Sequence, residues 1–232
     1  MAGYQDAAAR IAARIASGML MPGMQLGSER QLSEELAVSR LTLRAALTKL
    51  EADGLIYGMS RRGWFVSPPR FVYELDRRAN YMLMAAAQGR AARIELLDAG
   101  RAPEKHVPAC MREQATTRAF HLRRVRQLDG RPVMFETIHL SAAAVPDLLA
   151  HNLSDSITAL LADEYRIEID REETSVRSSL LDPEQSVALA VAPATHSVLI
   201  ERKRFACGQL VEFDSEHWLP GAIEIRLNAK LR

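Results

Sequence analysis

Apolar residues in the first part of the chain recur every three or four positions, which is the period of a helix with one buried face. Ser28 and Gln31 have the spacing of a capping box, in which a hydroxyl and an amide three residues apart satisfy backbone N–H groups at a helix start. Ser39 is placed to cap a second helix after a tight connection at residues 37–38. The apolar positions that define these two helices are Leu32, Leu36, Leu43, Leu47 and Leu50.

Beyond Gly54, which is predicted to end the second helix, the apolar period falls to two. Residues 55–57 and 64–66 are short runs of β-forming residues. The loop between these runs carries Arg61 and Arg62. This pattern predicts a β-hairpin with a basic tip directly after the second helix.

Pro68 and Pro69 break the pattern again, and we place a domain boundary near residues 67–72. The boundary divides the chain into residues 1–70 and residues 71–232. Strand-like runs joined by turn signals dominate the second part, with fewer helical stretches between them. This mixture predicts a mostly antiparallel α+β domain. The predicted strands span residues 120–128, 132–140, 167–181, 198–206, 210–219 and 222–227, and the predicted helices span 154–165 and 183–191.

The composition is that of an ordinary globular protein. Hydrophobic residues make up 48% of the chain and charged residues 25%, so a substantial core can form. No apolar run approaches the ~18 residues that cross a bilayer, and the N-terminus has no signal-peptide pattern. Two isolated cysteines, Cys110 and Cys207, give neither a disulfide framework nor a zinc site. These features predict a cytoplasmic protein with no membrane segment, no cofactor and no metal.

The predicted elements of residues 1–70 make a winged helix-turn-helix: two short helices, a tight turn, then a basic hairpin. The second helix of this motif fits the DNA major groove, where an arginine can bind guanine O6 and N7 bidentately. Arg40 and Arg44 lie four residues apart on one face of that helix, and Ser39 and Thr42 share its first turn. Arginines on a short helix are more often a solvated surface, and only their place in the whole motif favours contact with DNA. The charge supports this weakly, with nine Lys or Arg against six Asp or Glu among residues 1–70 and a net charge of +1 for the chain.

Six short stretches in a fixed order carry a family resemblance. They are Pro-Gly-Met-Gln-Leu at 22–26, Ser-Glu-Arg-Gln-Leu at 28–32, Val-Ser-Arg at 38–40, Leu-Arg-Ala-Ala-Leu at 43–47, Leu-Glu-Ala-Asp-Gly-Leu-Ile at 50–56 and Arg-Gly-Trp-Phe-Val at 62–66. On these stretches, residues 4–66 resemble the DNA-binding domain of the GntR family of regulators. The resemblance implies that the DNA contacts include Arg30, Arg40, Thr42 and Arg44, and that Gly63 lets the wing approach the minor groove.

Two further features complete the predicted DNA interface. Arg61 and Arg62 at the wing tip would lie along a phosphate backbone or enter the minor groove, although loop tips are often merely solvated. Leu41 departs from the Thr or Arg that the family often has at this position. A leucine can touch a thymine methyl group but cannot form a hydrogen bond, so it changes the expected base preference.

In the second domain, Arg124 and Arg126 are two residues apart on a predicted strand, so they project from the same face. Two adjacent guanidiniums repel one another unless an anion or an acid lies between them. A phosphate, phosphonate or carboxylate would fit this pair. Glu136 lies on the partner strand and would bind a ligand amine, a ligand hydroxyl or one of the arginines. The alternative is that both arginines simply pair with Glu136 and Glu201 across the sheet.

A second resemblance covers residues 72–230. Its carriers are His-Leu-Arg-Arg-Val-Arg at 121–126, Asp-Gly-Arg-Pro-Val at 129–133 and Gly-Gln-Leu-Val-Glu-Phe at 208–213. On these motifs the domain resembles the UTRA domain of the HutC branch, which has a chorismate-lyase-like fold and binds effectors. Residues 219–224 and 100–117 depart from the family pattern. The resemblance implies effector contacts at Arg124, Arg126, Glu136, Glu212 and Trp218, and a loop near Asn80-Tyr81-Met82 that closes over the ligand.

Together these observations predict a homodimeric transcription regulator, in first place a repressor that a small anionic effector releases from its operator. Trp218 also fits the role of a core anchor. The rival functions are an enzyme on the chorismate-lyase-like fold and a constitutive DNA-binding protein with a domain that only dimerises. No catalytic set of Ser, His and Asp and no phosphate-binding glycine loop occurs in the sequence, which disfavours the enzyme. A metal pair of His139 and His217 is likewise disfavoured, because the histidines show no ligand spacing.

Overall fold

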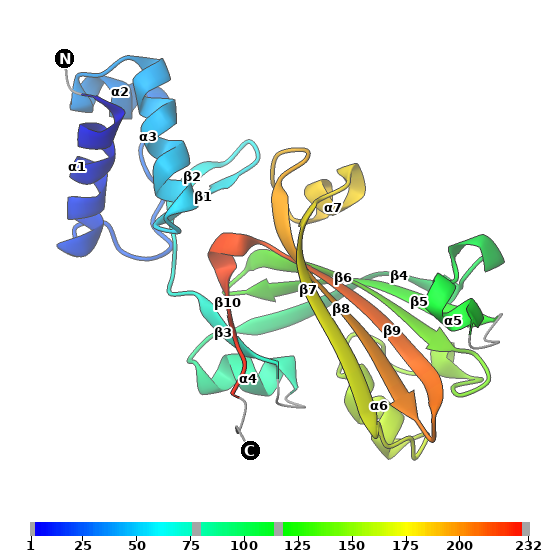
Figure 1. Cartoon of the computed structure of the whole chain (residues 1–232). Coiled ribbons are helices and arrows are strands. Elements are labelled where there is room, and N and C mark those ends of the chain that lie inside the picture. Colours follow the sequence, from blue (N-terminus) through cyan, green and yellow to red (C-terminus); the bar gives the residue numbers. More distant parts are fainter. Residues whose placement is uncertain (1–2, 76–79, 114–117, 229–232) are drawn as a thin grey trace. The chain divides into compact units, whose positions relative to one another are not determined.

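The computed structural model describes residues 3–75, 80–113 and 118–228 (Figure 1). Its internal contacts divide the chain into two units. The first unit takes in the chain up to Glu74, Ala190–Pro193 and the segment from Pro220 onward, and the second takes in Leu75–Leu189 and Ala194–Leu219. The predicted domain boundary stays a prediction. Among the described residues, no helix is both long and apolar enough to cross a membrane.

Three helices pack around one apolar core in the first unit. They are α1 (Tyr4–Ala16), α2 (Glu29–Leu36) and α3 (Arg40–Ala52). All the leucines that defined the two predicted helical faces are buried, and they share the core with Ile11 of the first helix. The predicted helix-turn-helix is therefore confirmed as a packed structure.

Local interactions fix the ends of these helices. Ser28 accepts a hydrogen bond from the backbone N–H of Gln31, and the Gln31 side chain accepts one from the backbone of Ser28 at 2.9 Å, so both halves of the capping box form. Ser39 accepts from the backbone N–H of Thr42 at 3.1 Å. Ala37 adopts the left-handed conformation, with φ 54°, and so turns the chain from α2 into α3 within a few residues.

A small antiparallel hairpin follows α3. Its strands are β1 (Ile56–Met59) and β2 (Gly63–Val66), and Gly54 ends α3 with φ 76°. Leu26 donates its backbone N–H to the carbonyl of Trp64 at 2.8 Å, and Val66 donates to that of Met24 at 2.9 Å. The hairpin is thus attached to the segment that precedes α2, which holds the predicted wing beside the helix-turn-helix.

The second unit contains a six-stranded sheet in which every neighbouring pair is antiparallel. The predicted hairpins at 120–128/132–140 and 198–206/210–219 are confirmed. The long strand predicted at 167–181 begins later, at Arg171, and the first strand of the sheet was not predicted. In spatial order the strands are β4 (Ala92–Arg101), β5 (Ala119–Leu128), β6 (Arg131–Ser141), β9 (Gln209–Trp218), β8 (His196–Ala206) and β7 (Arg171–Leu180).

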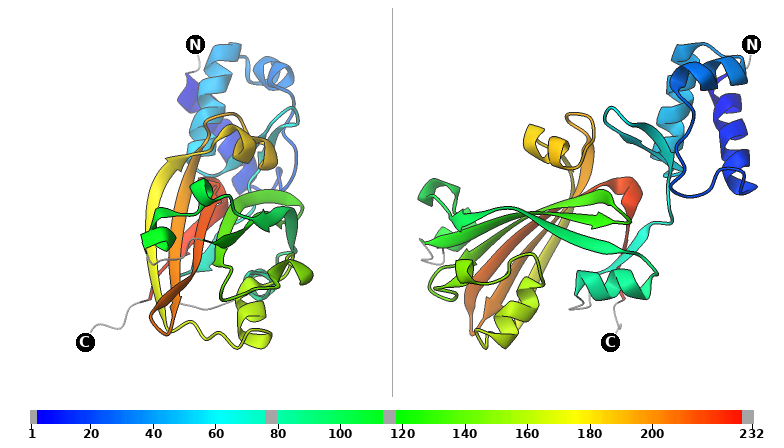
Figure 2. Two further views of the ribbon diagram at one scale, coloured as in Figure 1. Left: turned by 90° about the vertical axis from the view of Figure 1, so that its right-hand side faces the viewer. Right: turned by 180° about the vertical axis from the view of Figure 1, so that it is seen from behind.

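Helices lie on both faces of this sheet (Figure 2). On one face, α6 (Ile157–Asp163) packs on apolar residues of β5 and β6, and α4 (Tyr81–Ala87) lies over the end of β9. On the other face lie α5 (Ala109–Glu113) and α7 (Pro183–Ala188). In the described ranges, short 3-10 turns occur at Glu104–His106, Leu148–Ala150 and Pro220–Ala222.

The segment around Asn80 corrects one expectation. It was predicted as a loop that closes over a ligand, but Tyr81 begins helix α4 and Asn80 caps it by accepting a hydrogen bond from the backbone of Met82 at 2.8 Å. Residues 76–79, which precede it, lie outside the described residues. The family-like fold is otherwise as expected, with a mostly antiparallel α+β second part.

One parallel pairing stands apart from the main sheet. Strand β3 (Phe71–Glu74) follows the first unit's hairpin, and strand β10 (Ile223–Arg226) lies at the end of the described chain. The two pair in parallel, with Phe71 opposite Ile223. Both of these residues are buried, so the pairing has an apolar as well as a hydrogen-bonded component.

Candidate nucleic-acid interface and ligand site

The first turns of helix α3 face solvent. Arg40, Leu41 and Arg44 are exposed, and Leu41 keeps 81% of its surface accessible. On the opposite side of the helix, Leu43 and Leu47 are fully buried in the core. The helix therefore presents two guanidinium groups and one isobutyl group on a rigid support, which a major groove ~12 Å wide can admit.

Acidic neighbours hold two of the predicted DNA-contacting arginines. Arg44 donates from Nε to Glu29 Oε2 at 2.9 Å, and Arg30 donates from Nη1 to Glu34 Oε1 at 3.2 Å. Arg30, Glu34 and Arg44 are exposed and Glu29 is half-buried. Exposed ion pairs contribute ~0–1 kcal/mol, so these contacts orient the arginines without preventing exchange for a phosphate or a base.

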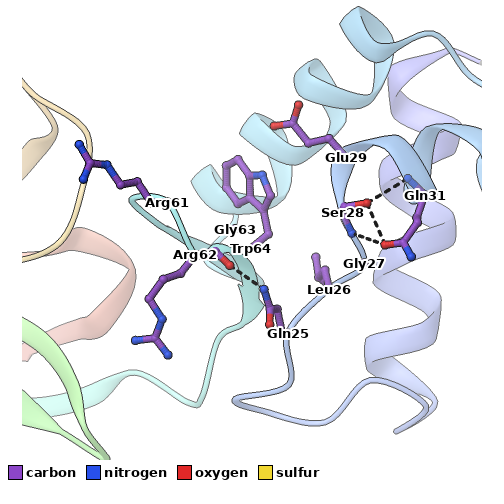
Figure 3. A pocket seen from close by; sticks show the side chains of 10 residues that line it. All are labelled: Gln25, Leu26, Gly27, Ser28, Glu29, Gln31, Arg61, Arg62, Gly63 and Trp64. Atoms are coloured by element: carbon purple, nitrogen blue, oxygen red, sulfur yellow. Dashed lines mark hydrogen bonds between the residues drawn. The ribbon is translucent and has the colours of Figure 1, made fainter.

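An open hollow of about 510 Å³ lies between the start of α2 and the wing (Figure 3). Ser28 and Gln31 lie on one side of it, and Arg61 and Arg62 extend from the wing tip away from them. Gln25 Nε2 donates to the backbone carbonyl of Arg62 at 2.6 Å, which fixes the wing tip to the strand-like segment before α2. A surface between a helix start and two arginines is suited to a phosphate backbone.

The predicted DNA contacts thus gather on α2, α3 and the wing of one unit. The hydroxyl oxygens of Ser39 and Thr42 lie 2.8 Å apart, so these residues also serve the cap of α3. Gly63 has φ 89°, a conformation that side chains rarely adopt, which explains glycine at the end of the wing loop. Contact with DNA stays a prediction for the whole set, which comprises Arg30, Ser39, Arg40, Thr42, Arg44, Arg61, Arg62 and Gly63.

In the second unit, charged side chains cross one face of the sheet, and we call the described members of this set the charged stripe. Their strand register places Arg124 opposite Glu136, Glu136 opposite Glu216 and Arg202 opposite Asp214. Most of them are buried, although charged residues usually lie at the surface. The charged stripe consists of Arg124, Arg126, Glu136, Glu172, Arg202, Arg204, Glu212, Asp214 and Glu216.

Arg124 is almost wholly buried and every donor group of its guanidinium has an acceptor. Nε donates to Glu136 Oε2 at 2.7 Å and Nη2 lies 2.5 Å from the same oxygen. Nη1 donates to the backbone carbonyls of Leu153 at 3.1 Å and Asp155 at 2.8 Å. Arg124 therefore joins β5 to β6 and to the segment before α6.

Arg126 approaches the same carboxylate from the other side. Its Nη2 donates to Glu136 Oε1, and its guanidinium lies 4.9 Å from the centre of the Tyr81 ring. The Tyr81 hydroxyl donates to the carbonyl of Gln127 at 3.0 Å, and its burial raises the pKa of the phenol well above the usual value. Burial opposes ionisation of Glu136, but the charges of Arg124 and Arg126 hold its pKa below the usual range.

The predicted pairing alternative is confirmed for Glu136, which fills the space between the two arginines. It is wrong for Glu201, which lies instead against Arg177, with Nη2 3.3 Å from Oε1. Trp218 is fully buried and donates from Nε1 to Glu216 Oε2 at 2.8 Å, as a core anchor would. Glu212 is also fully buried. Effector contact by Arg124, Arg126, Glu136, Tyr81, Glu212 and Trp218 stays a prediction.

Of the charged stripe on β7, β8 and β9, only Glu212 was named from the sequence, and the other members were missed. Arg202 Nη1 lies 2.7 Å from Glu172 Oε1, and Arg204 Nε lies 2.8 Å from Glu172 Oε2. Burial opposes ionisation of Glu172, yet the charges of Arg204 and Arg202 lower the pKa of its carboxyl to about 2. Carboxylate oxygens of Glu136, Asp214 and Glu216 come within 4.8 Å of one another. The available signal was two alternating series, arginines at 202 and 204 and acids at 212, 214 and 216, on strands joined by a hairpin.

Comparison with known families divides the chain as the two resemblances did. A family model described as "Bacterial regulatory proteins, gntR family" matches residues 3–66. A model described as "UTRA domain" matches residues 87–223. The match to the UTRA domain alone covers more than half of the chain.

Individual relatives agree with these matches. The chain is 30% identical over 223 residues to the uncharacterized HTH-type transcriptional regulator YihL of Escherichia coli, with 91% of each chain covered. It is 27% identical over 217 residues to the histidine utilization repressor of Pseudomonas putida, covering 90% of this chain and 86% of that one. The crystal structure of PhnF from Mycobacterium smegmatis has a TM-score of 0.66 at 20% identity, with 97% and 100% of the chains covered, and shows the same fold.

Proposed function

The chain belongs to the GntR family of bacterial transcription regulators and carries a UTRA domain, and on this premise we propose that it is a repressor whose grip on operator DNA is controlled by a small molecule. The observation that carries the DNA-binding part is the exposed start of α3, where Arg40, Leu41 and Arg44 project on the side opposite the buried leucines. The proposed repressor acts on DNA in the cytoplasm.

The DNA-binding part is tested by selecting duplexes that bind the full chain and titrating the best one over a range of salt concentrations. Contacts to DNA phosphates release counterions, so the affinity is expected to fall steeply as salt rises. In a plot of log binding constant against log salt concentration, each contacted phosphate adds about 0.9 to the magnitude of the slope. The double variant Arg61→Ala/Arg62→Ala should weaken all sequences similarly and reduce that slope by about 2. An unchanged slope in the variant would remove the wing from the interface.

The sensing part rests on the UTRA domain and on the charged stripe in its sheet. The relative from Pseudomonas is named for histidine utilization, which fits a regulator of catabolism that responds to a metabolite. In the titration described above, the effector should release the selected duplex at a concentration that also raises the thermal midpoint of the protein. A duplex that no metabolite of any class releases would favour the rival function, constitutive DNA binding.

A homodimer is the second part of the proposal, because a helix-turn-helix gains useful affinity from two half-sites. Strand β7 is an edge of the sheet, and Val176 and Leu180 on it are 46% and 53% exposed. Two copies of β7 paired antiparallel about Ser175 would place Glu173 of each opposite Arg177 of the other.

This arrangement is checked by sedimentation. The parent protein is expected to be a dimer, Arg177→Glu a weaker dimer because Glu173 then faces a like charge, and the exchange Glu173→Arg/Arg177→Glu a dimer again. A monomer for the parent would contradict the homodimer. A dimer that is insensitive to both variants would place the contact elsewhere.

A further inference from the structure

The arginines of the charged stripe already form ion pairs with acidic side chains of the protein. Arg124 and Arg126 share Glu136, and Arg202 and Arg204 share Glu172. Arg204 also donates to Glu212, and Arg202 Nε lies 3.5 Å from Glu216 Oε1. The described stripe holds four arginines and five acidic residues, so it offers an incoming anion no excess of positive charge.

Two acceptors of the stripe are left over. Glu212 Oε2 and Asp214 Oδ1 are buried and have no hydrogen-bond partner among the described residues, and the two residues are 0% and 1% exposed. They stand two residues apart on β9 and so project from the same face. Buried acceptors without donors are costly, and a folded protein retains few of them unless a ligand or a water supplies the hydrogen.

The charges around Asp214 indicate which kind of hydrogen-bond donor would bind there. Its oxygens lie close to those of Glu136 and Glu216, so negative charge accumulates on this part of β9. Burial, reinforced by Glu136 and Glu216, raises the pKa of the Asp214 carboxyl well above its usual value, and Arg204 opposes this only in part. A donor that carries positive charge would offset the negative charge that gathers here.

A nitrogen donor suits this position better than a metal ion. A divalent cation there would need Glu136 and Glu216 as ligands, but these carboxylates already bind Arg124, Arg126 and Arg202. A second cation of charge two beside three guanidiniums would be repelled by them. An ammonium or similar N–H group brings one charge and directional donors, and it needs only the two acceptors that have none.

We propose that Glu212 and Asp214 form an acceptor subsite for an amine-bearing ligand, so that the effector of this protein carries an ammonium or protonated N–H group. The inference rests on the proposed sensing function and specifies its ligand class. It replaces the expectation of a purely anionic effector, because the pair Arg124 and Arg126 is occupied by Glu136.

The test uses the full chain without DNA and probes that differ in one group. Glucosamine is compared with glucose, histamine with imidazolepropionate, and inorganic phosphate and Mg²⁺ serve as the anion and the metal alone. The amine of at least one pair is expected to raise the thermal midpoint, and its partner, phosphate and Mg²⁺ are not.

Two variants assign the effect to the subsite. Asp214→Asn removes the charge at constant shape and should weaken the amine by about tenfold or more, as expected for loss of a charged hydrogen bond. Asp163→Asn, at the exposed end of α6, is the matched control and should bind as the parent does. Because Asp214→Asn also relieves a buried carboxyl, its own midpoint should be no lower than that of the parent.

Four results would overturn the subsite: no amine binds, phosphate or Mg²⁺ stabilises as well as the amine does, Asp214→Asn binds the amine undiminished, or the variant unfolds. The last would mean that Asp214 is a structural residue hydrated by water only. These outcomes are independent of DNA. Amine binding that leaves a bound duplex in place keeps the subsite and refutes the sensing function, whereas a duplex released by phosphate alone keeps the function and refutes the subsite.

Discussion

Arg44→Ala is expected to weaken binding of the selected operator duplex by about 5- to 150-fold, because a bidentate arginine–guanine contact contributes ~1–3 kcal/mol. Arg44 is exposed on α3 and is held by Glu29 in a contact that DNA can replace. The loss should be concentrated at one base position, where the variant tolerates substitutions that the parent rejects. Fluorescence anisotropy with a set of single-base variants of the duplex measures both effects.

Lys49→Ala is the matched control for this prediction. Lys49 lies on the same helix but near its other end, where it binds Asp53 at 2.8 Å. It should retain most of the affinity and all of the base preference. If Arg44→Ala bound every duplex as tightly as the parent, α3 would not be the helix that reads the bases.

Glu136→Ala is expected to destabilise the second unit by about 3–5 kcal/mol, the range found when one partner of a buried ion pair is removed. The carboxylate is fully buried and lies against both Arg124 and Arg126, so its loss leaves two guanidinium charges without their shared anion. Chemical denaturation followed by circular dichroism measures the change.

Two further variants test whether the loss of stability in Glu136→Ala comes from the unpaired charges of Arg124 and Arg126. Glu201→Ala removes the exposed partner of Arg177 and should change the free energy of unfolding by only ~0–1 kcal/mol. The triple variant Arg124→Met/Arg126→Met/Glu136→Leu removes the cluster altogether and should recover much of the loss. A stable Glu136→Ala protein would contradict a structural role. Arg124→Ala is a poor probe of ligand binding for the same reason, since it would report unfolding.

Helices α2 and α3 could be predicted because the sequence signals that set their ends are local. The capping box of Ser28 and Gln31 and the glycine after α3 lie within a few residues of the ends they set. The Glu29–Arg44 contact could not be predicted in the same way. It joins residues fifteen positions apart on two helices, and only their packing brings them together.

The strands of the sheet were harder to predict where polar residues and tertiary packing determine their position. Strand β4 alternates half-buried and exposed residues, and its pairing with β5 shifts between Leu96 and Asp98, so no simple period marks it. The predicted start of β7 failed because Ile167 and Ile169 pack into the apolar core from a loop. Helix α4 is short, and its apolar residues gave no helical period long enough to recognise.

The charged stripe shows a limit of strand patterns. The alternation at residues 212–216 places acids on one face, and such a face is normally solvent-exposed in an antiparallel sheet. Here that face is buried, and Arg202 and Arg204 on the neighbouring strand form ion pairs with Glu216 and Glu212. Glu212 and Trp218 were singled out by resemblance, whereas Asp214 and Glu216 needed the register of three strands.

The pairing of β3 with β10 has a consequence for biosynthesis. The ribosome makes the helices and wing early, and their contacts are local, so they can fold while the rest of the chain is still being translated. Strand β3 cannot complete its pairing until Ile223–Arg226 have been translated. A chain that terminates before Ile223 would therefore carry the helices, the wing and a β3 without its partner strand. Such an unpaired strand edge is prone to aggregation, so nonsense mutations before Ile223 are expected to lower the amount of soluble protein.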